Sequence, residues 1–193
     1  ELERVRVYLL NDEKKVKSLF DDGIEIKLYT AIFDELKTLK AKSIMYDENT
    51  ISYRLFESIP HSCRAVKCKD PAMLMKAVKN SAEIACTKHA HIRDGAAVTR
   101  FIKWLKANVS TDEITEISAA DYLWEERRRQ GAYDLSFDTI AGYGPHGAIV
   151  HYSATPESEV TLQPRGFLLL DSGAQYLDGT TDITRTIALG ELT

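Results

Sequence analysis

Cysteine is scarce in this chain, and its few cysteines follow no recognisable pattern. There are three, Cys63, Cys68 and Cys86, an odd number without the close paired spacing of zinc ribbons and redox motifs. A disulfide framework is therefore not expected, and isolated thiols that serve packing are typical of a reducing compartment. The sequence predicts a cytoplasmic protein.

Long apolar runs and an excess of positive charge are also missing. No run approaches the ~20 apolar residues of a membrane-spanning helix, and residues 1–4 do not resemble a signal peptide. The net charge is −4 and the isoelectric point about 5.8, whereas nucleic-acid-binding surfaces are usually basic. We therefore expect neither a membrane nor a nucleic acid among the partners. The 44% of hydrophobic and 28% of charged residues place the chain in the ordinary globular class.

Residues 1–69 predict a small α/β domain. Alternating or apolar stretches typical of strands take turns with amphipathic stretches typical of helices. Such alternation favours a partly parallel sheet. The expected strands are 4–10, 24–28 and 43–46, and the expected helices are 13–20, 31–39 and 50–58.

Helices dominate the next part of the chain. Asp70-Pro71 marks a domain boundary and opens a helix at 72–78, because proline is favoured in a first helical turn. The longest helical pattern runs over 81–107. A capping-box pattern predicts another helix over 110–130, where the arginines 127–129 complement the negative end of the helix dipole.

The sequence does not assign one common role to the histidines of the second half of the chain. His89 and His91 lie two residues apart on a predicted helix, so they point to different faces and are expected to pack or hydrogen-bond rather than bind one metal. A glycine-rich loop with His146 leads into a predicted strand, Ala148–Ser153, that carries His151. A lone histidine in an apolar strand is more often a core residue than a catalytic one, and the loop position of His146 is less diagnostic.

Two aspartates occupy unusual places in the last predicted strands, 166–171 and 180–189. Asp171 ends an apolar strand that should be buried, and Asp182 lies inside a strand, where aspartate is disfavoured. A buried carboxylate is costly unless it is paired, hydrogen-bonded or bound to a metal, and paired carboxylates suit ions such as Mn²⁺, Mg²⁺ or Zn²⁺. Other interpretations stay open: Asp171 caps the turn, and Asp182 pairs with Arg185 or lies at a sheet edge.

The sequence of this hairpin is long and specific. Residues 171–186 read Asp-Ser-Gly-Ala-Gln-Tyr-Leu-Asp-Gly-Thr-Thr-Asp-Ile-Thr-Arg-Thr. They closely resemble the metal-binding hairpin of aminopeptidase P (Xaa-Pro aminopeptidase), a family of pita-bread metallopeptidases. The resemblance covers about residues 70–193, and residues 1–69 resemble the preceding domain of that family more weakly. It includes the segments 76–80, 91–95, 136–140 and 147–152.

The resemblance implies a mixed α/β and α+β fold in two parts. Residues 1–69 would be the C-terminal part of a middle α/β domain that is similar to the creatinase N-terminal domain. Residues 70–193 would be the N-terminal half of the pita-bread catalytic domain. Because the chain begins without methionine and stops just after the hairpin, we expect a fragment of a longer protein. Half a domain leaves a sheet face uncovered, which favours a homodimer.

The resemblance also implies an enzyme that hydrolyses the N-terminal peptide bond before a proline, so its partner is a peptide with proline in the second position. In the family, two divalent metal ions, most often manganese with zinc or cobalt as alternatives, are held by two aspartates, one histidine and two glutamates. Asp171 corresponds to the first aspartate, and Asp182 to the one that bridges both metals and the attacking hydroxide. His151 corresponds to a catalytic histidine, and Thr184, on the same strand face as Asp182, would support the ligands.

The remaining ligands of the family have no counterpart in the chain. Only Glu191, in the wrong context, follows Asp182 among the residues of the required types. We therefore expect an incomplete metal site and a chain that is inactive alone. The alternatives are a prolidase or creatinase relative, a non-catalytic peptide- or protein-binding module on the same fold, and a purely structural α/β protein.

Overall fold

The fold comes from a computed structural model that describes residues 5–10 and 23–191. The chain divides into two compact units, residues 1–78 and 79–193, and each is described by itself. The division falls between Val78 and Lys79. Pro71 is the first residue of a helix within the first unit, as the preference of proline for a first helical turn predicts.

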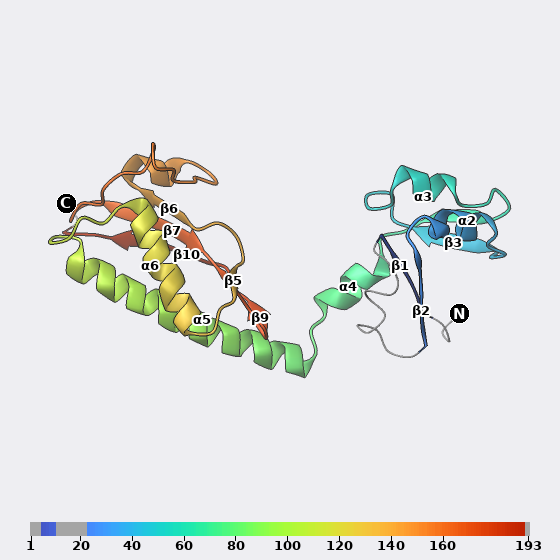
Figure 1. Cartoon of the computed structure of the whole chain (residues 1–193), viewed down its shortest axis with the longest axis horizontal. Coiled ribbons are helices and arrows are strands. Elements are labelled where there is room, and N and C mark those ends of the chain that lie inside the picture. The colour runs from blue at the N-terminus through green and yellow to red at the C-terminus, as the bar shows by residue number, and fades with distance from the viewer. Residues whose placement is uncertain (1–4, 11–22, 192–193) are drawn as a thin grey trace. The chain divides into compact units, whose positions relative to one another are not determined.

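The first unit contains two pairs of parallel strands and short helices (Figure 1). Strand β1 (Val5–Leu9) pairs with β2 (Ile24–Leu28), and β3 (Ser43–Tyr46) pairs with β4 (Arg64–Lys67). The helices are α2 (Ala31–Lys37), α3 (Tyr53–Glu57) and α4 (Pro71–Ala77).

These elements confirm the α/β pattern predicted for the first part of the chain. Strand β4 was not predicted, and the predicted helix at 13–20 lies outside the described residues. Helix α3 is shorter than the predicted 50–58. The side chain of Ser52 accepts a hydrogen bond from the backbone N–H of Leu55, so it caps the helix at residue 53.

Two long helices, α5 (Ser81–Asn108) and α6 (Glu116–Arg129), lie side by side in the second unit (Figure 1). Helix α6 begins at Glu116, so the prediction of a helix from residue 110 is wrong. Thr115 and Ser118, rather than the earlier residues, form the reciprocal capping box that starts it. Among the helices of the described ranges, none is long and apolar enough to cross a membrane.

The two helices pack on one face of a three-stranded antiparallel sheet. Its strands are β6 (Ile140–Tyr143), β7 (Phe167–Ser172) and β10 (Ile183–Ala188), in the order β10-β7-β6. The buried side chains between helices and sheet form the main core, because the apolar stripes of both layers meet there. They include Val98, Phe101, Leu105, Leu123, Leu168, Leu170 and Ile187.

A second, smaller sheet continues the hairpin beyond a break. It consists of β5 (Asp134–Leu135), β8 (Ala174–Tyr176) and β9 (Gly179–Thr180). The single strand predicted over 180–189 is therefore wrong, because residues 181–182 separate β9 from β10. Gly173 interrupts the opposite strand at the same level. The carbonyl oxygen of Thr181 accepts a hydrogen bond from a side chain there, Ser136 Oγ, 2.9 Å away.

A buried ion pair joins the two helices. Arg127 of α6 donates from Nε and Nη2 to the carboxylate of Asp94 on α5, at 2.7 and 3.1 Å, and both side chains are fully buried. The hydroxyl of Tyr176 donates to the same carboxylate, 3.1 Å away. Burial, together with the charge of Asp94, raises the pKa of Tyr176 well above its usual range. Arg127 thus links α6 to α5 through a buried ion pair, whereas its place at a helix end had indicated only an interaction with the helix dipole.

Candidate metal centre on the hairpin

Asp171 lies on the face of the sheet that the helices leave open. Its neighbour Leu170 is buried against the helices, and side chains alternate along a strand, so Asp171 points to the opposite side. Across the ladder Asp171 pairs with Thr184 of β10, whose Oγ1 donates to Asp171 Oδ1 at 2.8 Å. The side chain is half-buried, so the expectation of a fully buried residue is wrong.

Asp182 lies just before β10, in the break between the two sheets. It is exposed and not inside a strand, which corrects both expectations about its surroundings. Asp182 directly precedes Ile183, the first residue of the ladder, and lies two residues before Thr184, the partner of Asp171. The alternative pairing with Arg185 is not seen, because Arg185 Nη1 donates to the carbonyl oxygen of Thr184. Within the described residues the Asp182 carboxylate has no hydrogen-bond or ionic partner.

The oxygens of these carboxylates are ligands that a divalent metal ion accepts, but two aspartates are fewer than a metal site usually has. Asp171 keeps Oδ2 without a hydrogen-bond donor in the described part of the chain, and Asp182 keeps both oxygens. Carboxylate oxygens without hydrogen-bond donors suit Mn²⁺ or Mg²⁺, which prefer oxygen ligands. Over residues 5–10 and 23–191, however, no group of three or more histidine, cysteine, aspartate or glutamate side chains is arranged to hold a metal ion.

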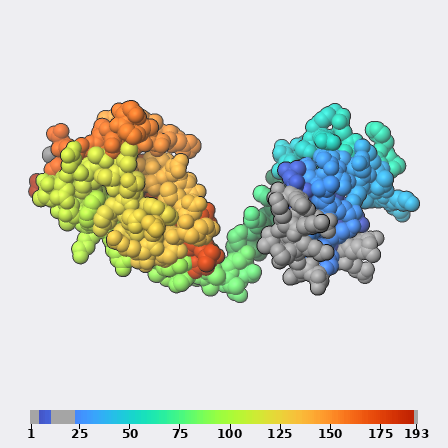
Figure 2. Space-filling model, viewed as in Figure 1, coloured from blue at the N-terminus to red at the C-terminus, as the bar shows by residue number. Residues whose placement is uncertain are grey.

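His151 does not lie on a strand, so the prediction of a strand over 148–153 is wrong. A 3₁₀ helix, η2 (Gly144–Ala148), follows β6 and leads into turns, and His151 is exposed with a φ of 56°. Pro145 starts the helical turn because its ring fixes a helical φ. The segment from 144 to 160, called here the histidine loop, lies at the surface of the second unit, where Figure 2 shows it in orange.

The histidine loop begins on the same face of the sheet as Asp171. A Cβ on Gly147 would lie 3.3 Å from the Leu169 side chain, and a Cβ on Gly142 would lie 2.9 Å from the backbone of Gly147, so η2 packs closely on β6 and β7 there. Leu169 and Asp171 are two residues apart on β7 and therefore share a face. In the described part of the chain no hydrogen bond or ion pair joins His151 to the two aspartates.

Glu116 is a buried residue of this region that the sequence did not single out. Its side chain is fully buried at the start of α6, although a glutamate in a first helical turn is usually exposed and only favours the helix dipole. His146 Nδ1 lies 2.9 Å from Glu116 Oε1, and the Tyr152 hydroxyl donates to Oε2 at 2.8 Å. His146 thus has a structural partner.

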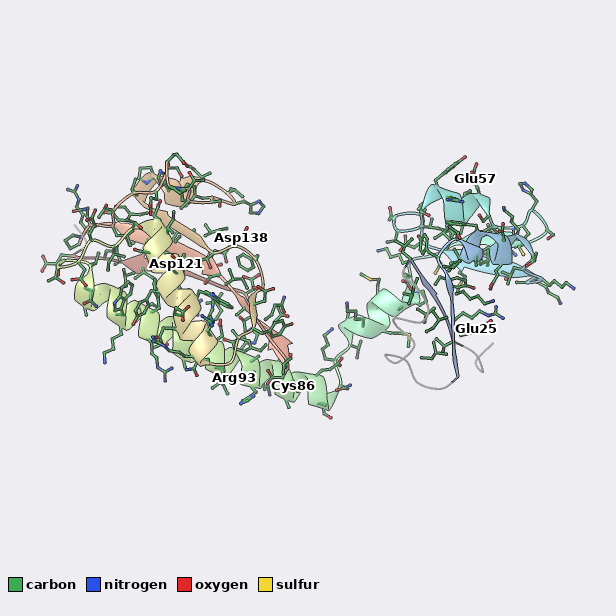
Figure 3. All side chains as sticks on the ribbon, in the orientation of Figure 1. Glu25, Glu57, Cys86, Arg93, Asp121 and Asp138 are labelled. Carbon is green, nitrogen blue, oxygen red and sulfur yellow. The ribbon has the colours of Figure 1, made fainter. Side chains whose placement is uncertain are left out.

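His89 and His91 hydrogen-bond within or next to α5, as predicted. His91 Nδ1 lies 2.9 Å from the carbonyl oxygen of Thr87, one turn earlier. His89 and Arg93 both contact the carboxylate of Asp178 at the turn between β8 and β9, and Figure 3 shows Arg93 on the same helix. The hydrogen bond from His89 first, and the charge of Arg93 after it, hold the pKa of Asp178 below its usual range.

Comparison with family models assigns both parts of the chain. The model of metallopeptidase family M24 matches residues 85–193, and the model of the creatinase/prolidase N-terminal domain matches residues 2–83.

Curated proteins and solved structures agree with these family models. The chain is 34% identical to aminopeptidase P2 of Arabidopsis thaliana and 38% identical to Xaa-Pro aminopeptidase 1 of Dictyostelium discoideum, with 99% and 100% of the chain covered. It superposes with a TM-score of 0.87, at 30% identity over its whole length, on an X-prolyl aminopeptidase from Caenorhabditis elegans described as a cytosolic enzyme with a di-nuclear active site. The chain spans about a third of each of these proteins. The comparisons confirm the predicted fold, a creatinase-type N-terminal α/β part followed by part of a pita-bread domain.

Proposed function

Because the chain belongs to metallopeptidase family M24, we propose that it is part of a metal-dependent Xaa-Pro aminopeptidase, which removes the first residue of a peptide whose second residue is proline. Its identity to proteins with that name supports this activity. The observation that supports the proposal is the hairpin of β7 and β10, in which Thr184 hydrogen-bonds one oxygen of Asp171 and Asp182 lies two residues before Thr184.

The two aspartates are the proposed metal ligands of this chain. Thr184 holds one oxygen of Asp171, which fixes the rotamer of that carboxylate and leaves its other oxygen for a metal ion. Divalent ions bound there would acidify a coordinated water and polarise the peptide carbonyl. Manganese is the proposed metal, because carboxylate oxygens favour a hard cation, and two ions are proposed because a similar solved enzyme is di-nuclear.

His151 is the proposed catalytic residue that hydrogen-bonds the substrate. Its imidazole is exposed, and within the described residues no side chain or backbone group occupies either ring nitrogen. An imidazole N–H free of protein partners is available to donate to the substrate carbonyl oxygen as charge develops on it. The positive φ of His151 is unusual for a residue other than glycine and is typical of residues held for a function.

The wider assignments are proposals as well. Residues 1–69 would be the C-terminal part of a middle domain, and residues 70–193 the N-terminal half of the catalytic domain, so the 193-residue chain alone should show no turnover. A cytoplasmic location is supported by the cytosolic relative and by the free thiols of all three cysteines. A homodimer is supported by exposed apolar side chains of the second unit such as Phe167 and Val150.

The test is a hydrolysis assay on the full-length protein that contains this chain. With Mn²⁺ present, we expect cleavage of tripeptides that have proline in second place and none of matched tripeptides with alanine there. Asp182→Asn should abolish turnover. Asp121→Asn is the matched control, because Asp121 is an exposed carboxylate on α6, on the helix side of the sheet (Figure 3).

The outcomes separate the candidate functions. Cleavage of Xaa-Pro dipeptides alone would indicate a prolidase. Absence of turnover by the full-length protein with any proline peptide would contradict an aminopeptidase and favour a binding module on the same fold. Equal loss in Asp121→Asn and Asp182→Asn would show a general charge effect instead of a metal site.

A further inference from the structure

Glu116 is a fully buried carboxylate that the proposed chemistry does not use. A buried carboxylate costs several kcal/mol unless hydrogen bonds and charges compensate it. Its backbone is already fixed, because Glu116 N–H donates to the carbonyl oxygen of Val160 at 3.2 Å and Thr115 forms an isolated antiparallel bridge with Thr161. The start of α6 and the end of the histidine loop therefore run side by side.

The carboxylate of Glu116 holds both ends of the histidine loop. Directly before the loop, the backbone N–H of Tyr143, the last residue of β6, donates to Oε1 at 2.7 Å. At the end of the loop, the backbone N–H of Val160 donates to Oε2 at 3.3 Å. One side chain thus closes the loop, with a different oxygen for each end.

The same carboxylate also holds the interior of the loop. His146 Nδ1 donates to Oε1 at 2.9 Å, and the Tyr152 hydroxyl donates to Oε2 at 2.8 Å. The two rings stack with centroids 4.6 Å apart. Burial, and with it the hydrogen bond to Glu116, raises the pKa of Tyr152, so the hydroxyl keeps its proton and remains a donor.

These anchors lie on both sides of His151. Ile149 N–H donates to the carbonyl oxygen of His146 at 3.1 Å, and Tyr152 N–H donates to that of Ile149 at 3.2 Å. The short backbone chain from His146 to Tyr152 therefore passes through His151. The His151 side chain has no hydrogen-bond partner of its own in the described residues, so its place depends on the backbone that Glu116 fixes.

We propose that Glu116 is a positioning residue: its buried carboxylate fixes the histidine loop and thereby the place of His151 in the active site. The inference rests on the catalytic role proposed for His151. It assigns to Glu116 no contact with substrate or metal.

The test compares the kinetics of the full-length protein and five variants. Glu116→Gln keeps the size of the side chain but turns an NH₂ group toward N–H donors, so the loop loses part of its anchor. We expect kcat to fall about 10- to 100-fold, as for other residues that orient a catalytic group, with little change in KM and in metal content. Glu113→Gln, an exposed carboxylate just before the helix, is the control and should leave kcat unchanged.

A double-mutant comparison separates positioning from a general structural role. If Glu116 acts through His151, then adding Glu116→Gln to His151→Ala should lower kcat by no more than about twofold, because residues that act as a unit are not additive. Tyr152→Phe keeps the buried carboxylate and removes one anchor, so it should lower kcat less than Glu116→Gln does. Tyr152→Phe replaces Glu116→Gln as the test variant if Glu116→Gln does not fold.

Hydrogen–deuterium exchange gives a readout that does not depend on activity. Glu116→Gln or Tyr152→Phe should speed exchange in residues 144–160 relative to Glu113→Gln. Unchanged exchange, an unchanged kcat, or a full loss on top of His151→Ala would each overturn the inference. If the wild type shows no turnover but exchange rises, the proposed function fails while the anchoring by Glu116 holds.

Discussion

Gly173→Ala is the substitution that the hairpin should tolerate least. Gly173 lies between β7 and β8, opposite the break formed by residues 181–182. A Cβ at this position would lie closer than 3.0 Å to both the carbonyl oxygen of Thr181 and Ser136 Oγ. Ordinary contacts of a Cβ begin near 3.4 Å, so the carbonyl oxygen of Thr181 and the hydroxyl of Ser136 must each move away by about an ångström or more.

The expected cost follows from that displacement. Overpacking in a closely packed place costs about 1–3 kcal/mol. Losing the hydrogen bond from Ser136 to Thr181 adds about 1 kcal/mol. We therefore expect the free energy of unfolding to fall by about 2–4 kcal/mol. Because Asp182 directly follows Thr181, the full-length variant should also bind Mn²⁺ about 10- to 100-fold more weakly.

The stability assay is urea unfolding of this chain, followed by the fluorescence of Trp104 and Trp124, both of which lie in the second unit. Gly95→Ala is the matched control. A Cβ at Gly95, inside α5, meets nothing within 4 Å, so this change should stabilise the helix by about 0.5–1 kcal/mol. A Gly173→Ala variant as stable as the wild type, with unchanged Mn²⁺ affinity, would refute the reasoning.

Three further predictions follow from single contacts. Arg127→Leu leaves the buried carboxylate of Asp94 without its cation and should lower the free energy of unfolding by about 3–5 kcal/mol, whereas replacing both residues by leucine should recover most of it in the same urea assay. The pKa of Asp178 is lowered in the folded protein, so its stabilisation is present above its ordinary pKa of 3.8 and is lost as the pH falls through the folded value. Amide exchange at the β8–β9 turn, corrected for intrinsic rates, should rise below that pH in the wild type and not in Asp178→Asn. Thr184→Val removes the hydrogen bond to Asp171 and should weaken Mn²⁺ binding by the full-length protein about tenfold, measured by calorimetry; an unchanged affinity would show that this bond does not orient the ligand.

Local patterns predicted the regular elements of the fold. The alternation of residues 24–28 was enough for β2, and the apolar spacing over 81–107 was enough for α5. Both patterns reflect the burial of one face, which is a property of the segment itself. The start of α6 was mistaken because residues 110–113 offer a capping pattern as good as that of the true cap at Thr115.

Long-range contacts account for the errors. The segment 148–153 is apolar and β-branched, which favours a strand, yet the loop there is held by Glu116, which lies far away in the sequence. At the break of residues 181–182, Thr181 accepts a hydrogen bond from Ser136, a long-range contact that no periodicity within the strand reveals.

In the candidate site too, local sequence patterns predicted some features, and features that depend on long-range contacts were missed. The long hairpin motif indicated Asp171 and Asp182 as ligands, and the period of a strand indicated that Thr184 would support them; the structure pairs Thr184 with Asp171. The motif did not show that Asp182 is exposed. Burial of Glu116 could not be predicted, because a glutamate at the start of a helix satisfies the dipole equally well in water.

The most direct test of the account is the metal content of the full-length protein after dialysis against Mn²⁺, measured by elemental analysis. The account predicts about two ions per chain in the wild type, as in a di-nuclear relative. It predicts a clear loss in both Asp171→Asn and Asp182→Asn and none in the Asp121→Asn control. Retention of the wild-type metal content by Asp171→Asn and Asp182→Asn would contradict the assignment of these aspartates as ligands and, with it, the proposed enzyme.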